Sequence, residues 1–297
     1  MNRDPIPTIE WQTLALIVGN YVAFVVVCIN YHVLPWWLVV VMGAVMVCLH
    51  GSLQHEAIHG HPTRHRRLNE WLVYPALGLW LPYEIYRDTH LKHHIDEYIT
   101  DPFEDPESYF VTGKNWQHCG AMQRACLLVR NTVLGRLVLG PLWTFITFSQ
   151  SEIISIARGD TTHLRYWGWH AVSVALVLWW LNFCDIPIAE YVLLFAYPGL
   201  SLTMLRSFLE HQADPDPARR TAVVKSGRLM GLLFLNNNLH ALHHEQPALP
   251  WYRLPAEYSR RSAEILSRNG GYFYTGYLQI IRRHLLSPKT HPRHPFI

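Results

Sequence analysis

The sequence has few charged residues and no cysteine pattern that would fix its fold. Asp, Glu, Lys and Arg make up only 16% of the 297 residues, and the formal net charge is +3. This charge is too mild, and the basic residues are too scattered, to predict a nucleic-acid surface. The five cysteines lack the pair spacing of a metal site, and they predict no disulfide framework. A glycine-rich dinucleotide fingerprint is also missing, so the chain is not expected to supply electrons by itself.

Apolar residues are abundant instead, and they are gathered into long runs. Half of the residues are hydrophobic, and 12 are Trp. A helix needs about 20 mostly apolar residues to cross a hydrocarbon core of about 30 Å. Four runs approach this length: residues 12–30, 33–49, 166–184 and about 188–209. A short turn separates the first two and the last two runs, so we predict an all-α integral membrane fold with four transmembrane helices in two hairpins.

The basic residues predict on which side of the membrane the other segments lie. Neither hairpin turn contains Lys or Arg, Arg3 precedes the first run, and all other basic residues lie in the two large segments outside the runs or at their edges. The positive-inside rule therefore places both termini in the cytoplasm. Residues 50–165 and 210–297 are expected to form a mostly helical cytoplasmic cap, and residues 1–297 a single domain. We expect no cleaved signal peptide, because the first run lacks a basic stretch close before it.

Two further apolar segments are too short to cross a membrane. They cover residues 71–83 and 137–149, and both are interrupted by Pro and Gly. Segments of this kind are more typical of the membrane interface or of re-entrant loops. We expect them to line a path from the bilayer to a site in the cap.

Nineteen histidines are the most unusual feature of the composition, and eight of them fall into three boxes. The boxes are His55-Glu56-Ala57-Ile58-His59, His90-Leu91-Lys92-His93-His94 and His240-Ala241-Leu242-His243-His244. Residues three and four apart share a helical face, so each longer box is expected to direct three imidazoles toward one point. All three boxes fall on the predicted cytoplasmic side. Eight imidazoles exceed what one ion coordinates, so two metal ions are predicted, and the ligand type alone leaves iron and zinc open.

In this order, around two membrane hairpins, the boxes resemble those of the membrane fatty acid desaturase and hydroxylase superfamily. The resemblance covers about residues 33–255, and the stretch from His55 to Asp105-Pro106-Glu107-Ser108 looks most like its bacterial fatty acid desaturase or hydrocarbon oxygenase branch. It implies two non-haem irons, O2 as co-substrate, and desaturation or hydroxylation of a fatty acyl chain or lipid. It also implies an external electron donor (a ferredoxin, rubredoxin or cytochrome) and a bacterial inner membrane.

The resemblance adds a ninth histidine to the predicted ligands. The family commonly has one near the cytoplasmic end of the span before the third box, where this chain has His211. Some members have Asn one turn before that histidine, where this chain has Ser207. The predicted metal ligands are therefore His55, His59, His90, His93, His94, His211, His240, His243 and His244.

Polar side chains near the boxes are candidates for holding the ligating rings in place. An acceptor on the outer N–H of a metal-bound imidazole fixes the orientation of the ring. The candidates are Glu56, Asp88, Asp101, Glu210 and Asn236. Simpler local roles are open for three of them: Asp88 can pair with Arg87, Asp101 can begin a turn, and Asn236 can cap a helix.

Other functions compete with this interpretation. The first box is also a His-Glu-x-x-His zinc metalloprotease signature with Glu56 as general base, although this leaves two boxes unexplained. A metal transporter would need polar residues in mid-membrane, where the runs offer little beyond Asn20, His170 and Thr203. We expect His170 to be hydrogen-bonded inside the helical bundle. A hydrocarbon or terpenoid monooxygenase on the same scaffold also stays open, because all these oxidations begin by removing hydrogen from an unactivated carbon.

Overall fold

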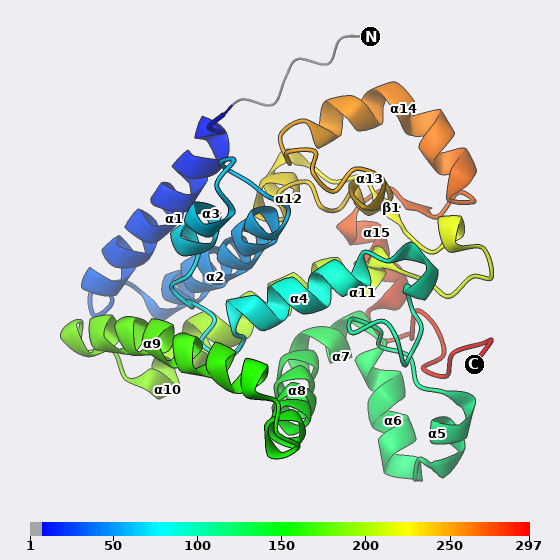
Figure 1. Cartoon of the computed structure of the whole chain (residues 1–297), viewed down its shortest axis with the longest axis horizontal. Coiled ribbons are helices and arrows are strands. Elements are labelled where there is room, and N and C mark those ends of the chain that lie inside the picture. The colour runs from blue at the N-terminus through cyan, green and yellow to red at the C-terminus, as the bar shows by residue number, and fades with distance from the viewer. Residues whose placement is uncertain (1–7) are drawn as a thin grey trace.

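Two long apolar helices, α1 (Trp11–Ile29) and α2 (Trp36–Ile58), pack against each other at the start of the chain (Figure 1). The computed structural model describes residues 8–297, and Arg3 lies outside them. Helix α2 continues well beyond the apolar run expected to end at residue 49. It ends only before Gly60, whose φ of 97° suits glycine at a helix end. The first histidine box therefore lies on the last turn of a long apolar helix and not beyond it.

A third apolar stretch packs on α2 and is helical throughout. It consists of α10 (Ile188–Tyr191), the π-helical turn η2 (Val192–Ala196) and α11 (Tyr197–Glu210). The wide turn comes directly before Pro198, which has no N–H to donate and whose ring would clash with the carbonyl four residues earlier. A π-helical turn accommodates both defects without ending the helix.

Two glycines allow this stretch to approach α2 closely. A Cβ atom on Gly43 would lie 2.7 Å from the Phe195 ring, and one on Gly199 would lie 2.5 Å from the Val47 side chain. Small residues at such positions bring helix backbones together. The close approach matters for the site, because α2 and α11 lead directly to His55 and His211.

Among residues 8–297, three helices are long and apolar enough to cross a membrane: Trp11–Ile29, Trp36–Ile58 and Ile188–Glu210. They contain most of the first, second and fourth predicted runs. All of the third run except its last residue lies within α9 (Thr161–Phe183), which is not among the three. The four-span arrangement and its cytoplasmic cap therefore stay predictions.

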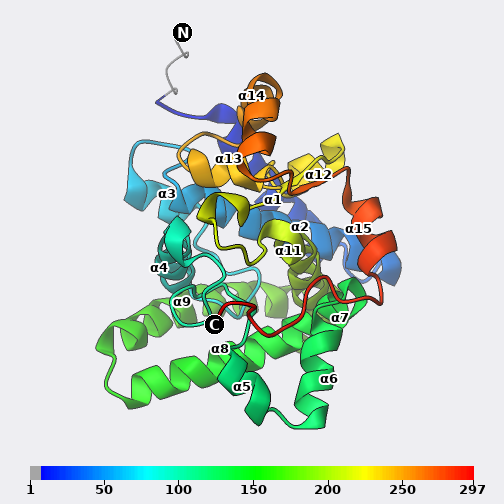
Figure 2. The ribbon, with the colours of Figure 1, turned by 90° about the vertical axis from the view of Figure 1, so that its right-hand side faces the viewer.

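Shorter elements complete the fold around these helices. Helices α4 and α8 pack against α9, and both views place α9 and α14 on opposite sides of the molecule (Figures 1 and 2). The described residues contain only one small sheet, in which β1 (Val223–Val224) pairs in parallel with β2 (Phe273–Tyr274). The other elements are α3 (Arg66–Leu72), α4 (Tyr83–His93), η1 (Asp96–Tyr98), α5 (Gly113–His118), α6 (Ala121–Arg130), α7 (Val133–Val138), α8 (Gly140–Ala157), η3 (Pro217–Arg219), α12 (Arg228–Leu233), α13 (His240–Glu245), α14 (Leu254–Arg268) and α15 (Tyr277–His284).

The two short apolar segments take different forms. Residues 71–83 begin at the end of α3 and continue as turns up to α4. Residues 137–149 fall in α7 and α8, and α8 is 18 residues long, which extends the helix beyond the expected segment. Both segments contribute to the cavity described below.

Candidate metal centre

Nine histidine side chains converge from α2, α4, α13 and the end of α11, and they form two groups. In each group, one nitrogen from every residue lies within 4.8 Å of the others. The first group contains His55, His59, His90, His94 and His243, and the second contains His93, His211, His240 and His244. These are the nine residues that the sequence suggested, and the structure brings all of them together.

The two longer boxes are each divided between the groups, so the expectation that each directs three imidazoles toward one point is wrong. His90 and His94 belong to the first group, whereas His93 belongs to the second. In the third box the pair four residues apart, His240 and His244, joins the second group. Around a helix axis, the side chains of residues four apart point in directions that differ by about 40°, whereas those of neighbouring residues differ by about 100°. Each box therefore reaches both groups.

The ring nitrogens that face one another are spaced as ligands of a common ion would be. The Nε2 atom of His90 lies 3.1 Å from those of His59 and His94. In the second group, the Nε2 atoms of His93 and His211 are 2.9 Å apart. Two nitrogens bound about 2.1 Å from one ion, at about a right angle, are roughly 3 Å apart.

Acceptors on the opposite side of the rings fix which nitrogen faces the centre. The Nδ1 atoms of five histidines have oxygen partners: Glu107 at 2.8 Å from His90, Asp105 at 2.8 Å from His93, Asn237 at 3.0 Å from His240, Asp96 at 3.2 Å from His244 and Thr221 at 3.4 Å from His211. When Nδ1–H donates in a neutral imidazole, Nε2 carries a lone pair and no hydrogen. Lone pairs about 3 Å apart repel unless a cation lies between them. The residues present therefore fit one metal ion in each group.

The protonation of the rings agrees with this arrangement. Burial, followed by neighbouring imidazoles, lowers the pKa of His94, His211 and His243, which favours the neutral form that binds metals. His93 behaves differently. Burial opposes its charge, but the nearby Glu107 and Asp105 carboxylates outweigh that effect and raise the pKa of His93 to about 9. A bound cation would take the place of that proton.

Three of the five residues expected to hold the rings contact no imidazole of the two groups. Asp88 pairs with Arg87 at 2.7 Å. Asp101 accepts from the backbone N–H groups of Phe103 and Glu104, as a turn-forming residue does. Asn236 has a φ of 55° and donates to the Trp251 carbonyl.

The other two expected residues lie close to the groups without a short bond to a ring. Glu56 is buried, 4.0 Å from Nδ1 of His55, and it accepts from the backbone N–H of Trp251. Glu210 pairs with Arg206 at 2.9 Å and lies 3.7 Å from Nδ1 of His240.

Sequence reasoning missed the five residues that do contact the outer nitrogens, one of which is Thr221 beside His211. Asp105 and Glu107 belong to the Asp-Pro-Glu-Ser segment that supported the family resemblance, and this was the available signal. Asp96 lies 148 residues from its partner His244, so nothing local links them. Asn237, and not the neighbouring Asn236, faces His240.

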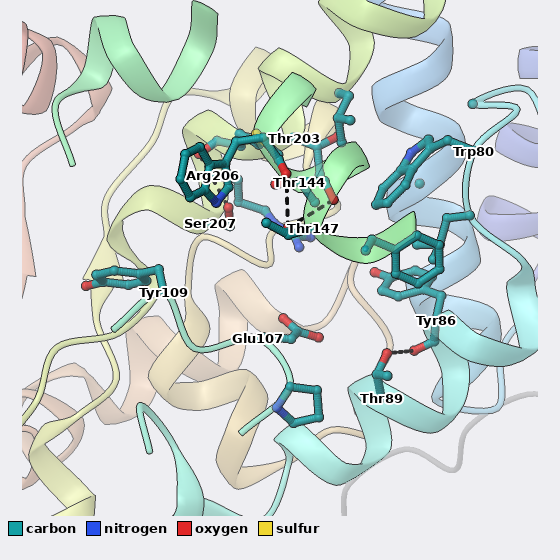
Figure 3. A pocket seen from close by; sticks show the side chains of 18 of the residues that line it. Trp80, Tyr86, Thr89, Glu107, Tyr109, Thr144, Thr147, Thr203, Arg206 and Ser207 are labelled. Atoms are coloured by element: carbon teal, nitrogen blue, oxygen red, sulfur yellow. Dashed lines mark hydrogen bonds between the residues drawn. The ribbon is translucent and has the colours of Figure 1, made fainter. Parts of the chain in front are cut away.

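A cavity of about 480 Å³ adjoins the histidine groups. Its side toward the centre is lined by His211, Glu107 and Glu210. Its apolar end is lined by residues 78–81 and by part of α8. Figure 3 shows Trp80 and Tyr109 on opposite sides of this space, with Glu107 between them.

His170 lies outside the two histidine groups, and its Nε2 atom is 3.0 Å from the Leu79 carbonyl, as expected for a histidine that is hydrogen-bonded inside the bundle.

The chain is mostly helical, has helices long and apolar enough to cross a membrane, and carries two groups of histidines that could each hold a metal ion. The sequence model of the family described as fatty acid desaturase matches residues 31–276. The chain belongs to the fatty acid desaturase family, and it is an oxidoreductase of the desaturase or hydroxylase type. None of the curated proteins compared with the chain matches it.

Proposed function

We propose that this protein uses O2 and electrons from an external donor to desaturate or hydroxylate a long apolar substrate, with one iron in each histidine group. The observation that carries this proposal is the inward convergence of the Nε2 atoms while oxygen acceptors hold the outer nitrogens. The two irons, when bound, would activate O2, which is the oxidant that removes a hydrogen from an unactivated carbon. The protein's own residues hold the rings and position the substrate.

The cavity supports an apolar substrate. Its path runs past Glu107 and His211 toward an end lined by Leu79, Trp80 and Phe148. A chain in this position has its reacting carbon beside the histidine groups and its tail among apolar side chains. Each buried methylene contributes about 0.8 kcal/mol, so affinity should rise with chain length until the apolar end is filled.

The zinc metalloprotease alternative receives less support from the geometry. The carboxylate of Glu56, which would be the general base of a protease, accepts from the backbone N–H of Trp251. The first group also draws on all three boxes, whereas the protease signature accounts for His55 and His59 only.

The location of the protein forms part of the proposal. We propose four spans, with α9 as the third, and both termini on the cytoplasmic side of a bacterial inner membrane. The absence of basic residues from both hairpin turns supports this orientation. A ferredoxin, rubredoxin or cytochrome would dock on the basic cytoplasmic side.

Metal analysis combined with turnover tests the proposed function. The purified protein should contain two irons per chain and consume O2 when a reduced ferredoxin and a fatty acyl substrate are supplied. A product mass change of about −2 indicates desaturation, and about +16 indicates hydroxylation. Protein stripped of iron by a chelator is the control and should recover activity with Fe²⁺ but not with Zn²⁺. One tightly bound zinc without O2 uptake would refute the proposal.

A further inference from the structure

One end of the cavity is basic. Arg130, at the end of α6, and Arg136, on α7, both line the cavity beside Tyr109. Arg130 donates to the Tyr109 carbonyl at 3.1 Å, and the Arg136 guanidinium lies 5.5 Å from the centre of the Tyr109 ring. The Lys289 ammonium lies 5.8 Å from the same ring centre. Three cationic side chains are therefore gathered around Tyr109, and two of them, Arg130 and Arg136, line the cavity. Figure 3 shows where Tyr109 lies in the cavity.

The carboxylates that line the cavity already have other partners. Asp105 bonds to His93, Glu107 bonds to His90, and Glu210 pairs with Arg206 at 2.9 Å. Each is therefore committed to the metal centre or to Arg206.

The two arginines lack such a partner. Within the part of the chain that the structure describes, neither Arg130 nor Arg136 forms an ion pair with a carboxylate, and the Nε atoms of both are buried without a hydrogen-bond partner. Burial, followed by the charge of Arg136, lowers the pKa of Arg130 to about 9. A buried charge without a counter-ion is costly, and an anionic ligand would remove that cost.

The opposite end of the same cavity is apolar. Leu79, Trp80, Leu81 and Phe148 are among the residues that line the cavity. In Figure 3, Glu107 lies between Trp80 and Tyr109. At about 30 Å³ for each water-sized group, the volume of about 480 Å³ holds about 16 such groups. A single chain of about a dozen carbons with a small head group fits this space.

Building on the proposed function, we propose that Arg130 and Arg136 bind an anionic group, a carboxylate or a phosphate, at one end of the substrate. The planar guanidinium groups suit both anions, because each presents paired N–H donors. The apolar chain then extends past Glu107 and His211 toward Trp80. The substrate is a single-chain amphiphile and not an uncharged hydrocarbon.

Three ligands with the same twelve-carbon chain test this subsite. Dodecanoate, dodecyl phosphate and methyl dodecanoate are titrated into the iron-loaded protein in a neutral detergent, and binding is followed by calorimetry. Hydrogen bonds to charged groups predict that at least one anion binds about 10- to 100-fold more tightly than the ester. The anion that binds more tightly identifies the anionic group of the substrate as a free carboxylate or a lipid-type phosphate. Equal binding of all three ligands overturns the proposal.

Variants separate the subsite from general effects on the fold. Arg130→Met and Arg136→Met should each reduce the preference for the anion by about tenfold and leave the affinity for the ester unchanged. Arg124→Met is the matched control, because Arg124 is also on α6 but bonds to the Trp116 carbonyl outside the cavity. If the preference persists in both Arg130→Met and Arg136→Met, the subsite assignment is wrong.

The binding assay is independent of catalysis, so the two proposals can fail separately. A preference for the anion without O2 uptake for any ligand supports the subsite and refutes the proposed oxidation. Equal oxidation and equal binding of the acid and its ester support the oxidation and refute the subsite.

Discussion

Replacing Asp105 with Asn should weaken metal binding in the second histidine group and leave the first group intact. The buried carboxylate of Asp105 accepts from Nδ1 of His93 at 2.8 Å and from the backbone N–H groups of Glu107 at 2.9 Å and Thr100 at 2.8 Å. Asparagine keeps the shape but has one oxygen, so its NH2 group must face one of these donors. Losing one bond to a charged acceptor costs about 1.5–3 kcal/mol, which corresponds to about 10- to 100-fold in metal affinity. Loss of a ring-orienting partner typically has an effect of this size.

The assay is a chelator titration with iron measured by mass spectrometry. The unaltered protein should release its two irons at similar chelator concentrations, whereas Asp105→Asn should release one of them at a 10- to 100-fold lower concentration. Glu104→Gln is the control, because Glu104 is an exposed neighbour whose carboxylate pairs with Lys92, and exposed pairs contribute about 0–1 kcal/mol. If Asp105→Asn releases both irons as the unaltered protein does, the assignment of the outer acceptor is refuted.

Three further predictions test the site, the helix packing and the topology. His94→Ala should lose iron and activity while His170→Ala keeps both, because His170 bonds only to a backbone carbonyl; the reverse result would overturn the ligand assignment. Gly199→Ala should destabilise the protein by roughly 1–3 kcal/mol in thermal unfolding, because its Cβ would lie 2.5 Å from Val47, whereas Gly51→Ala has open space and should not; equal unfolding temperatures would contradict the close packing. Cysteine labelling should place the turn between α9 and α10 on the opposite side of the membrane from the C-terminus, and labelling from the same side would rule out four spans.

The helices and the histidine boxes are the parts that the sequence predicted best. Apolar length alone indicated the helices that became α1, α2 and the stretch Ile188–Glu210, because membrane-type hydrophobicity is a local property. The end of α2 was placed nine residues too early, since the sequence becomes more polar there while the backbone stays helical up to Ile58. The structure also divided each longer box between the two histidine groups. The geometry of a single helix would have been enough to predict this division.

The contacts around the rings could not be predicted, because they depend on how distant segments fold over the centre. Candidates were chosen for being close to a box in sequence, and this criterion selected Asp88 and Asp101, which bond elsewhere. The actual partners of His93 and His90 lie 12 and 17 residues away, on a loop whose turns bring Asp105 and Glu107 beneath the rings.

The sequence by itself determined which side chains are available for the two histidine groups and which helices are apolar enough for a membrane. Both follow from spacing along one helix and from the composition of one run. Only the tertiary structure decided that His211 joins His93 and that Arg130 and Arg136 share a cavity with Trp80. Those relations depend on packing between separate elements, such as α11 on α2, α7 on α11 and α6 on α7.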